Sequence, residues 1–352
     1  MSPEQTTASP LQTAPPPTPG GPTTAFADRA HRRRALLLIA GLGVLAALTT
    51  IGILGAENPA DAFSRGWWII ARLRAEDLVV IAVVCACQSF ATVSFQTATQ
   101  NRIITPSIMG FESIYVLIQT SLVFFFGISG LSSVHDTAMF FLQAGIMMVF
   151  AVALYSWLLS GRHGNLHVLL LVGIIIGGGL GSLSTFLQRL LDPNAFDILS
   201  ARLFGNISNA RTEYLPYAIP IALGVCLILW LRTRRMNAIV LGRDVGTNLG
   251  LHHTRELMTT LLLVSILMAM TTSLVGPMTF LGFLVATVAY ALTDTYDHRV
   301  ILPVAFLSGY TLLTGSYYIL RHIFYAQGSV TIIVELIGGL VFLSVIMRKG
   351  RL

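Results

Sequence analysis

The sequence contains a single lysine, Lys349, close to its C-terminal end. A Walker-type phosphate loop ends in Lys-Ser or Lys-Thr, because the lysine ammonium contacts the terminal phosphates of the nucleotide. No such loop can exist here, so this chain cannot itself be a P-loop ATPase. The HExxH pattern of zinc proteases and the GxSxG turn of hydrolases are absent as well, which leaves an enzymatic function without support.

Cysteine is also scarce, and the three that occur, Cys85, Cys87 and Cys226, all lie inside apolar segments. This arrangement supports neither a disulfide framework nor a zinc site, so we interpret them as buried packing residues. None of the eight histidines is paired with another at metal-ligand spacing within a membrane segment. We therefore expect no metal and no cofactor to be bound by this chain.

Charged side chains make up only 11% of the 352 residues, whereas 54% are hydrophobic. Ordinary soluble domains carry about a quarter charged residues. The apolar runs reach roughly 20 residues, the length that crosses a bilayer as a helix. The basic residues flank these runs and form no continuous patch for nucleic acid. The fold class predicted is an all-α polytopic membrane protein embedded in a lipid bilayer.

Ten apolar segments can be counted, and we expect about ten transmembrane helices, with nine to eleven possible. The short pair around Gly276 and Pro277 could instead be one broken helix with a re-entrant turn. Residues 1–30 are rich in Pro, Thr and Ala and predict a disordered cytoplasmic tail, which leaves 31–352 as the transmembrane domain. The predicted segments are 35–54, 75–97, 107–127, 137–160, 166–188, 214–231, 256–276, 278–293, 300–319 and 330–347.

Arginine placement predicts the orientation of these segments. With ten spans and the N-terminus inside, 15 of the 22 basic residues fall on the cytoplasmic side and seven on the outer side. Short cytoplasmic loops retain Arg and Lys, so this bias favours an even number of spans. We expect a multi-pass protein of the cytoplasmic (plasma or inner) membrane with both termini in the cytoplasm.

Five glycines of the fifth segment could be mistaken for a phosphate-binding loop. They neither follow a strand nor open an amphipathic helix, and small residues at this spacing let membrane helices approach closely. We interpret them as packing positions: Gly173, Gly177, Gly178, Gly179 and Gly181.

Glu335 is the candidate for an ion-coupled carrier, because such carriers place ionisable residues within the membrane. It lies in the first turns of the last segment, towards the outer end. We expect it either to form a structural ion pair with Arg321 or to face an aqueous pathway, and the ion pair is the simpler interpretation.

A short apolar face is expected in the loop 236–251. Leu241, Val245 and Leu249 recur at four-residue steps, which aligns them on one side of a helix in an otherwise polar segment. Such a face suits docking on another protein, although it could also pack on its own bundle.

Three stretches together resemble the FecCD-type permeases of ABC importers for iron siderophores, haem and cobalamin. The first, 95–115, is similar to the family's loop between the second and third spans and is closest to its iron-chelate branch. It contains the pathway or structural candidates Gln96, Asn101, Pro106 and Gly110. The last two also have a plain physical interpretation, as a helix start and a small packing position.

The second stretch, 236–251, resembles the cytoplasmic coupling segment that docks on the ATPase in these permeases. The match to its Leu-Gly-acid-acid-x-Ala-x-x-Leu-Gly pattern is incomplete, since Arg243 stands where an acid is common. The coupling residues implied by the resemblance are Leu241, Gly242, Arg243, Asp244, Val245, Leu249 and Gly250.

The third stretch runs from 275–285 through 297–303 to 338–343 and is similar to the family's C-terminal motifs. Two departures stand out. Tyr290 replaces the arginine of a Pro-His-x-x-Arg motif, and Asp77 replaces the second arginine of an outer Arg-Leu-Pro-Arg motif. Arg74 and Arg321 match outer arginines that pair with acidic residues of a substrate-binding protein, and the Asp77 change suggests a partner permease with contacts of its own.

The resemblance implies the type II ABC importer permease fold and a set of partners. These are a second permease, more simply a different chain than an identical copy, two ATPase subunits that bind ATP and Mg²⁺, and an extracytoplasmic binding protein. The cargo implied is a ferric siderophore or another iron chelate. Haem or cobalamin import, and an ion-coupled secondary carrier, remain as alternatives.

Overall fold

The structure is a computed structural model. It describes residues 29–349 apart from gaps at 57–59, 62, 134–135, 160–165, 205–206, 208–211, 294 and 324–328. Almost all of the predicted tail, 1–28, lies outside the described residues. No strand occurs in the part of the chain that is described. The helices are α1 (Arg29–Gly55), α2 (Arg65–Thr99), η1 (Pro106–Met109), α3 (Phe111–Ser133), α4 (Asp136–Leu159), α5 (Leu166–Arg189), α6 (Pro193–Leu203), η2 (Thr212–Tyr214), α7 (Leu215–Leu231), α8 (Thr233–Ile239), α9 (Arg243–Asn248), α10 (His253–Val275), α11 (Leu281–Thr293), α12 (His298–His322) and α13 (Val330–Lys349).

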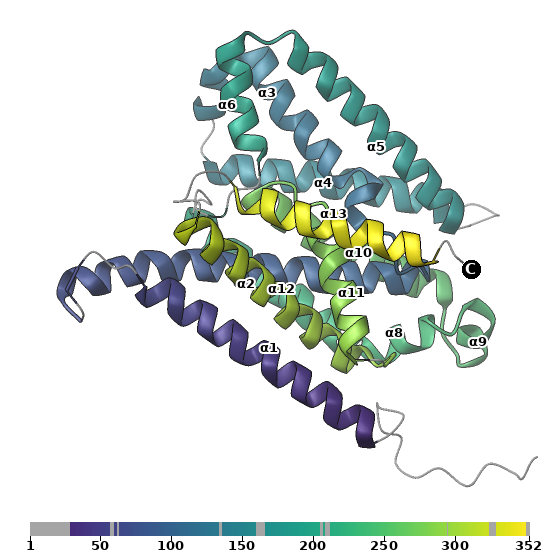
Figure 1. The fold of residues 1–352 in the computed structure, drawn as a ribbon. Helices are drawn as coiled ribbons and strands as arrows, with labels where there is room; N and C mark the ends of the chain where they lie inside the picture. The colour runs from purple at the N-terminus through teal and green to yellow at the C-terminus, as the bar shows by residue number, and fades with distance from the viewer. Residues whose placement is uncertain are drawn as a thin grey trace, which may run out of the picture.

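The α2 helix is the centre of the bundle. Its 35 residues span about 52 Å at 1.5 Å per residue, and it contacts α7, α10, α11 and α12 (Figure 1). The Ser64 hydroxyl oxygen caps its first turn by accepting from the Trp67 N–H, and Gln100 ends it in a left-handed conformation. In the most apolar stretch of α2, 78% of the residues are buried, so its neighbours shield this part of the helix. The first turns are more open, with Trp68, Ile69 and Leu73 exposed.

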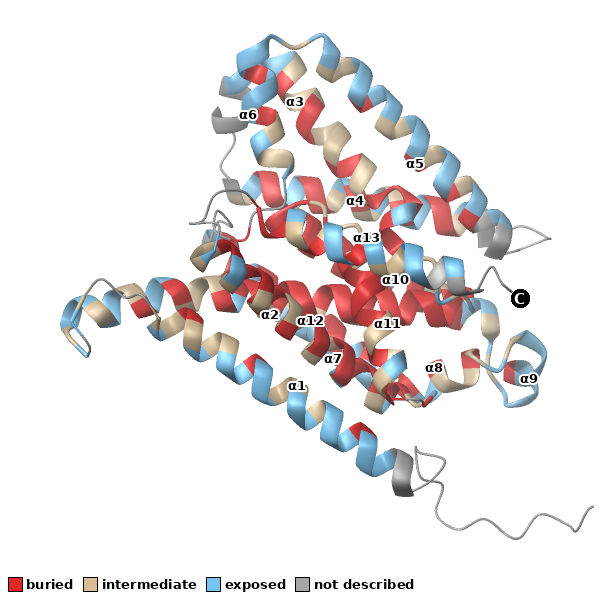
Figure 2. Cartoon of the chain, viewed as in Figure 1, coloured by how far each residue is buried: buried red, intermediate tan, exposed pale blue. Residues whose placement is uncertain are grey.

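The outer helices α1 and α5 present apolar side chains away from the protein. Only 11% of the apolar stretch of α1 and 22% of that of α5 is buried, and Figure 2 shows both helices largely as exposed. Leucine and isoleucine side chains in this position are stable in hydrocarbon and unfavourable in water. The bundle is therefore built for a bilayer or for contact with further subunits.

Each of the ten predicted segments corresponds to a helix. Among the described residues, seven helices are long and apolar enough to cross a membrane, and α7 with α8, bent by 60° at their junction, forms an eighth candidate. The apolar helices α11 and α13 are shorter. The break predicted at Gly276 is present, since α10 ends at Val275 and Gly276 adopts φ +88° before α11 begins. The α2 helix differs from its prediction by beginning ten residues earlier, at Arg65.

Two of the glycines in α5 allow a close approach of the chain. The η1 turn begins at Pro106 and ends at Gly110, whose φ is +92°. A Cβ on Gly177 would lie 2.9 Å from the Gly110 Cα, and a Cβ on Gly173 would lie 2.9 Å from the Met109 side chain. The packing interpretation is confirmed at these two positions. Gly178 and Gly179 have nothing within 4 Å of such a Cβ, so their small size is not required by this chain alone.

Candidate functional site around residues 236–251

The segment between α7 and α10 forms two short helices at one end of the bundle. α8 ends at Ile239, Gly242 turns the chain with φ +91°, and α9 follows. Gly246, buried within α9, faces the rest of the segment: a Cβ there would lie 3.6 Å from the backbone oxygen of Ala238. Gly250 then leads out of the segment with φ +85°. The turn glycines at 242 and 250 therefore set the shape of the segment.

The apolar residues of this segment point outward. Leu241 is 56% exposed, Val245 46% and Leu249 62%. Burying such a side chain stabilises a protein by about 1.5–3 kcal/mol. The three side chains do not gain this stabilisation within this chain, so it remains available to a partner that covers them. Arg243 and Asp244 are exposed beside them. A helix is present but shorter than predicted: α9 spans Arg243–Asn248, so Leu241 lies before the Gly242 turn and Leu249 is the C-cap residue. All three apolar side chains are nevertheless exposed.

Glu256, at the start of α10, forms salt bridges with two arginines at the α7–α8 junction. Its Oε1 accepts from Arg235 Nη1 at 2.7 Å, and its Oε2 accepts from Arg232 Nη2. The Glu256 side chain is 11% exposed, whereas those of Arg232 and Arg235 are 17% and 56% exposed. One carboxylate at the start of α10 thus holds the end of α7 and the first turn of α8.

A second attachment joins α8 to α12 through Asn237 and His298. The Asn237 amide nitrogen donates to Asp297 Oδ1 at 3.0 Å, so its oxygen is the atom that accepts from His298 Nδ1 and from the His298 backbone N–H. The other ring nitrogen, Nε2, lies 2.6 Å from the Thr97 hydroxyl of α2. His298 is 1% exposed. This chain of contacts runs from residues 236–251 to α2, the central helix of the bundle.

The loop after α2 completes the attachment. The Gln100 side chain donates to the Ile239 carbonyl at 3.2 Å, and Gln96 donates to the Arg102 carbonyl at 2.7 Å. Asn101 Oδ1 accepts from the Ile103 N–H at 2.9 Å, closing a tight turn. Gln96 and Asn101 therefore shape the loop that contacts the end of α8.

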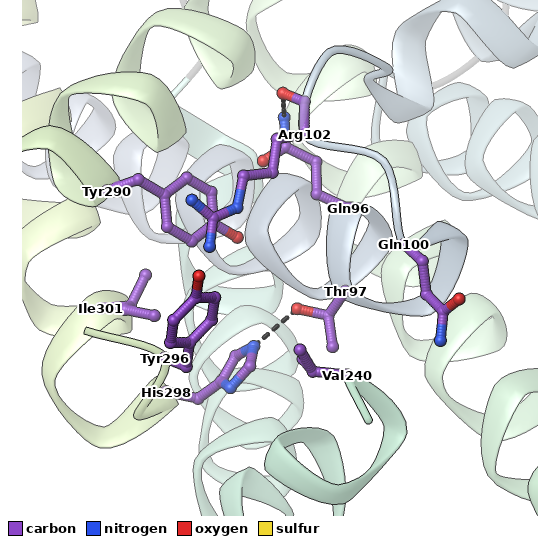
Figure 3. A pocket seen from close by; sticks show the side chains of 9 residues that line it. All are labelled: Gln96, Thr97, Gln100, Arg102, Val240, Tyr290, Tyr296, His298 and Ile301. Atoms are coloured by element: carbon purple, nitrogen blue, oxygen red, sulfur yellow. Dashed lines mark hydrogen bonds between the residues drawn. The ribbon is translucent and has the colours of Figure 1, made fainter. Parts of the chain in front are cut away.

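A cavity of about 140 Å³ lies between this loop, the end of α8 and the α11–α12 connection (Figure 3). The Arg102 guanidinium lies 4.3 Å from the ring centroid of Tyr290 and 5.1 Å from that of Tyr296. Arg102 thus stacks on the rings of two tyrosines that flank the α11–α12 connection. The cavity is lined by Gln96, Thr97, Gln100, Arg102, Val240, Tyr290, Tyr296, His298 and Ile301.

The carboxylates of Glu112 and Glu335 both lie beside Thr279, in the break between α10 and α11. The Thr279 hydroxyl donates to Glu112 Oε2 at 2.6 Å, and Glu335 lies near the Thr279 backbone. Gly338 allows this approach, because a Cβ there would lie 2.6 Å from the Phe280 Cβ. Glu335 is half-buried.

The predicted ion pair between Glu335 and Arg321 is wrong. Both residues are described, and the ion pairs found among the described residues all involve Glu256. Arg321 instead donates to the Tyr317 hydroxyl at 3.4 Å, and that hydroxyl donates to Asp77 Oδ2 at 2.7 Å. Asp77, which replaces an arginine of the family motif, is thus the acidic neighbour of Arg321.

Arg74 differs from the expectation of an exposed docking charge. Its side chain is 4% exposed, and Nη1 donates to the backbone oxygens of Ile53 at 3.0 Å and Ala56 at 2.7 Å. The last carbonyls of a helix lack partners within the helix, and a cation there satisfies them. Arg74 fixes the end of α1 to α2, and of the two predicted docking residues Arg321 is the more exposed.

The sequence model of the FecCD transport family matches residues 34–348. The chain belongs to this family. It is 44% identical to the petrobactin import system permease protein FatC of Bacillus anthracis over 329 residues, which cover 94% of this chain and 93% of that protein. It is 32% identical to the petrobactin import system permease protein YclO of Bacillus subtilis, covering 79% of this chain and 88% of that protein.

The fold of this FecCD-family chain is also found among solved structures. A metal-chelate type ABC transporter in an inward-facing conformation superimposes with a TM-score of 0.76 and 20% identity, covering 89% of this chain and 99% of that one. The helical bundle of this chain thus has a fold that occurs among ABC transporters.

Sequence reasoning missed Glu256, Asn237 and His298. Asn237 and His298 lie within the stretches that resemble family motifs, but no role was assigned to them, and each of the three residues acts through a residue 21 to 201 positions away. Glu256 had one recognisable signal, since it is an acid in the first turn of α10 soon after a run of arginines. No group of three or more potential metal ligands occurs among the described residues.

Proposed function

We propose that this chain is the membrane-spanning permease subunit of an ABC importer that carries a ferric siderophore of the petrobactin type into the cytoplasm. The observation that carries the proposal is the match over nearly the whole chain to two petrobactin import permeases. The exposed apolar face of Leu241, Val245 and Leu249 supports it, because a permease without an ATPase site needs such a contact.

The partners follow from the same architecture. Two ATPase subunits, which bind ATP and Mg²⁺, contact the coupling segment, a second permease chain completes the pathway, and an extracytoplasmic binding protein delivers the chelate. The exposed apolar surfaces of α1 and α5 leave room for lipid and for the second permease. Both termini lie in the cytoplasm, as the arginine distribution favours. A second permease that differs from this chain would supply docking charges absent here.

ATP binding closes the ATPases and moves the coupling segments, which changes the side to which the pathway is open. The rigid attachment of α8 through Glu256 and through His298 transmits this movement to α10, α12 and α2. Pro106 and Gly110 hold the η1 turn against α5, and Glu335 beside the α10–α11 break faces the pathway.

Uptake by a strain that lacks the natural permease gene tests the proposed function. Expression of this chain with its ATPase, second permease and binding protein should restore accumulation of iron-55 supplied as ferric petrobactin, and depletion of ATP should abolish it. Restoration of haem or cobalamin uptake, with no iron-55 uptake, would replace the proposed cargo. Uptake that persists in the absence of the ATPase would indicate an ion-coupled carrier instead.

Arg321 should take part in docking of the binding protein. Reversal of the charge in Arg321→Glu places a carboxylate near Asp77 and towards an acidic partner, so we expect the association rate to fall about tenfold at low salt and the deficit to shrink as salt is added. Surface plasmon resonance on the assembled transporter in nanodiscs measures this rate. Arg189→Glu, at the end of α5, serves as the matched control. Equal rates for wild type and Arg321→Glu would remove Arg321 from the docking surface.

A further inference from the structure

The first two turns of α2 extend past the helices beside them. Arg74 donates to two backbone oxygens at the end of α1, so the level of Arg74 marks where α1 ends. On the other neighbour, the Tyr317 hydroxyl donates to Asp77, and α12 ends little more than one turn later, at His322. Residues 65–71 therefore lie beyond the ends of both helices, and Figure 1 shows the start of α2 projecting from that end of the bundle.

This projection places the start of α2 outside the bilayer. The apolar run of α1, 35–54, is about 30 Å long and matches the hydrocarbon core. The headgroup layer adds about 5–8 Å on each side. At 1.5 Å per residue, Trp68 lies about 9 Å and Arg65 about 13 Å beyond the level of Arg74. The side chains before Ile69 thus stand clear of lipid, at the end of α2 that is farthest from the coupling segment.

The projecting turns carry an apolar face in this exposed position. Arg65, Trp68, Ile69 and Arg72 recur at helical spacing, so they lie on one side of α2. Trp68 is 59% exposed and Ile69 57%, both arginines are exposed, and Phe63, just before the helix, is 76% exposed. We call these five side chains the α2 tip. An aromatic and aliphatic centre between two arginines is typical of binding hot spots, which are rich in Trp and Arg.

The aromatic side chains of the α2 tip are held in a fixed arrangement. The ring centroids of Phe63 and Trp67 lie 5.5 Å apart, and those of Trp67 and Trp68 lie 4.9 Å apart. Phe63 has φ +62°, a conformation that bulky residues rarely adopt and that costs free energy. Side chains that are already ordered lose less entropy when a partner covers them, so the α2 tip is pre-organised for binding.

We propose that the α2 tip is a docking contact for the extracytoplasmic binding protein, which covers it with an apolar patch edged by carboxylates. The inference rests on the proposed function, which supplies a binding protein on this side of the membrane. The α2 tip is continuous with Arg321, because Arg321 donates to Tyr317 and Tyr317 donates to Asp77, two turns along α2 from Ile69. The two contacts differ in chemistry: Arg321 acts through charge, whereas the α2 tip holds the complex by burying apolar area.

Trp68→Ala tests this contact in the assembled transporter in nanodiscs. We expect the affinity for the binding protein loaded with ferric petrobactin to fall about tenfold or more, mainly through faster dissociation. Because the lost contact is apolar, added salt should not reduce the deficit, in contrast to Arg321→Glu. Trp157→Ala is the matched control, since Trp157 is 70% exposed near the C-terminal end of α4, and it should bind as the wild type does. Unchanged thermal unfolding of both variants shows that the fold is intact.

A spin label on Ile69→Cys identifies what covers the α2 tip. The three natural cysteines are buried, so the label should select the new one. In the free transporter, a water-soluble nickel reagent should collide with this label more often than oxygen dissolved in lipid does. Saturation with the binding protein should then protect the label from nickel. A label on Leu223→Cys, exposed in the middle of α7, should gain no protection.

The outcomes separate this inference from the proposed function. Preferential collision of the Ile69→Cys label with oxygen would show lipid at the α2 tip, and protection from nickel before the binding protein is added would show the second permease there. Either result, or equal affinities of the wild type and Trp68→Ala, would overturn the inference and leave the proposed function standing. A wild-type transporter that binds no binding protein would overturn both.

Discussion

ATP-driven uptake falls at least about a hundredfold when Val245 and Leu249 are both replaced by serine. The two side chains are 46% and 62% exposed, so the substitutions remove little from the fold of this chain. In a docked complex they would be buried, and loss of two such contacts costs about 3 kcal/mol or more. Iron-55 uptake measured together with ATP hydrolysis should show hydrolysis no longer linked to transport.

The control for this double variant is Leu227→Ser, on the exposed face of α7, which changes an apolar residue to serine away from the coupling segment. It should retain uptake near the wild-type level. Normal coupled uptake by the double variant, at wild-type amounts in the membrane, would refute the docking role of the face.

Glu256→Ala should lower the free energy of unfolding by about 2–3 kcal/mol. The carboxylate is 11% exposed, and its removal leaves the largely buried Arg232 without its partner. Thermal unfolding in detergent measures the loss, and hydrogen exchange of residues 233–252 should increase because α8 loses its anchor. Iron-55 uptake by Glu256→Ala should also fall, because the coupling segment would no longer move as one body with α10.

The two arginines serve as internal comparisons for Glu256. Arg235→Ala, whose side chain is 56% exposed, should cost less than about 1 kcal/mol, whereas Arg232→Ala should cost more. If Glu256→Ala unfolds at the wild-type temperature and its exchange is unchanged, the salt bridge is not the anchor of the segment.

Element positions could be predicted from the sequence because membrane helices are specified locally. Each apolar run of about 20 residues must satisfy its own backbone hydrogen bonds, so its position alone predicts a helix. The break at Gly276 and the close packing of Gly173 and Gly177 were also visible, since positive φ and small size are properties of one residue. Helical spacing predicted one apolar helix face over 241–249, but only Val245 of the three lies within α9, because the Gly242 turn separates Leu241 from the helix and Leu249 ends it.

Side-chain pairing could not be predicted in the same way. Arg74 was expected at the surface, but the end of α1 lies against it and offers two carbonyl groups. Glu335 was expected beside Arg321, but the Gly338 contact with Phe280 places it near Thr279 instead. These contacts depend on how helices that are far apart in the sequence pack against one another. The spacing of apolar residues along the chain carries no information about that packing.

The central claim is that this chain is a permease subunit coupled to an ATPase through residues 241–250. Site-specific cross-linking of Val245→Cys tests this claim most directly. The three natural cysteines are all buried, so a thiol reagent should select the new one. We expect a short thiol cross-linker to join Val245→Cys to an ATPase subunit in membranes, with a yield that changes on ATP addition. Ile323→Cys, exposed at the other end of α12, should not react with the ATPase. A cross-link from Ile323→Cys to the ATPase, with none from Val245→Cys, would contradict the account.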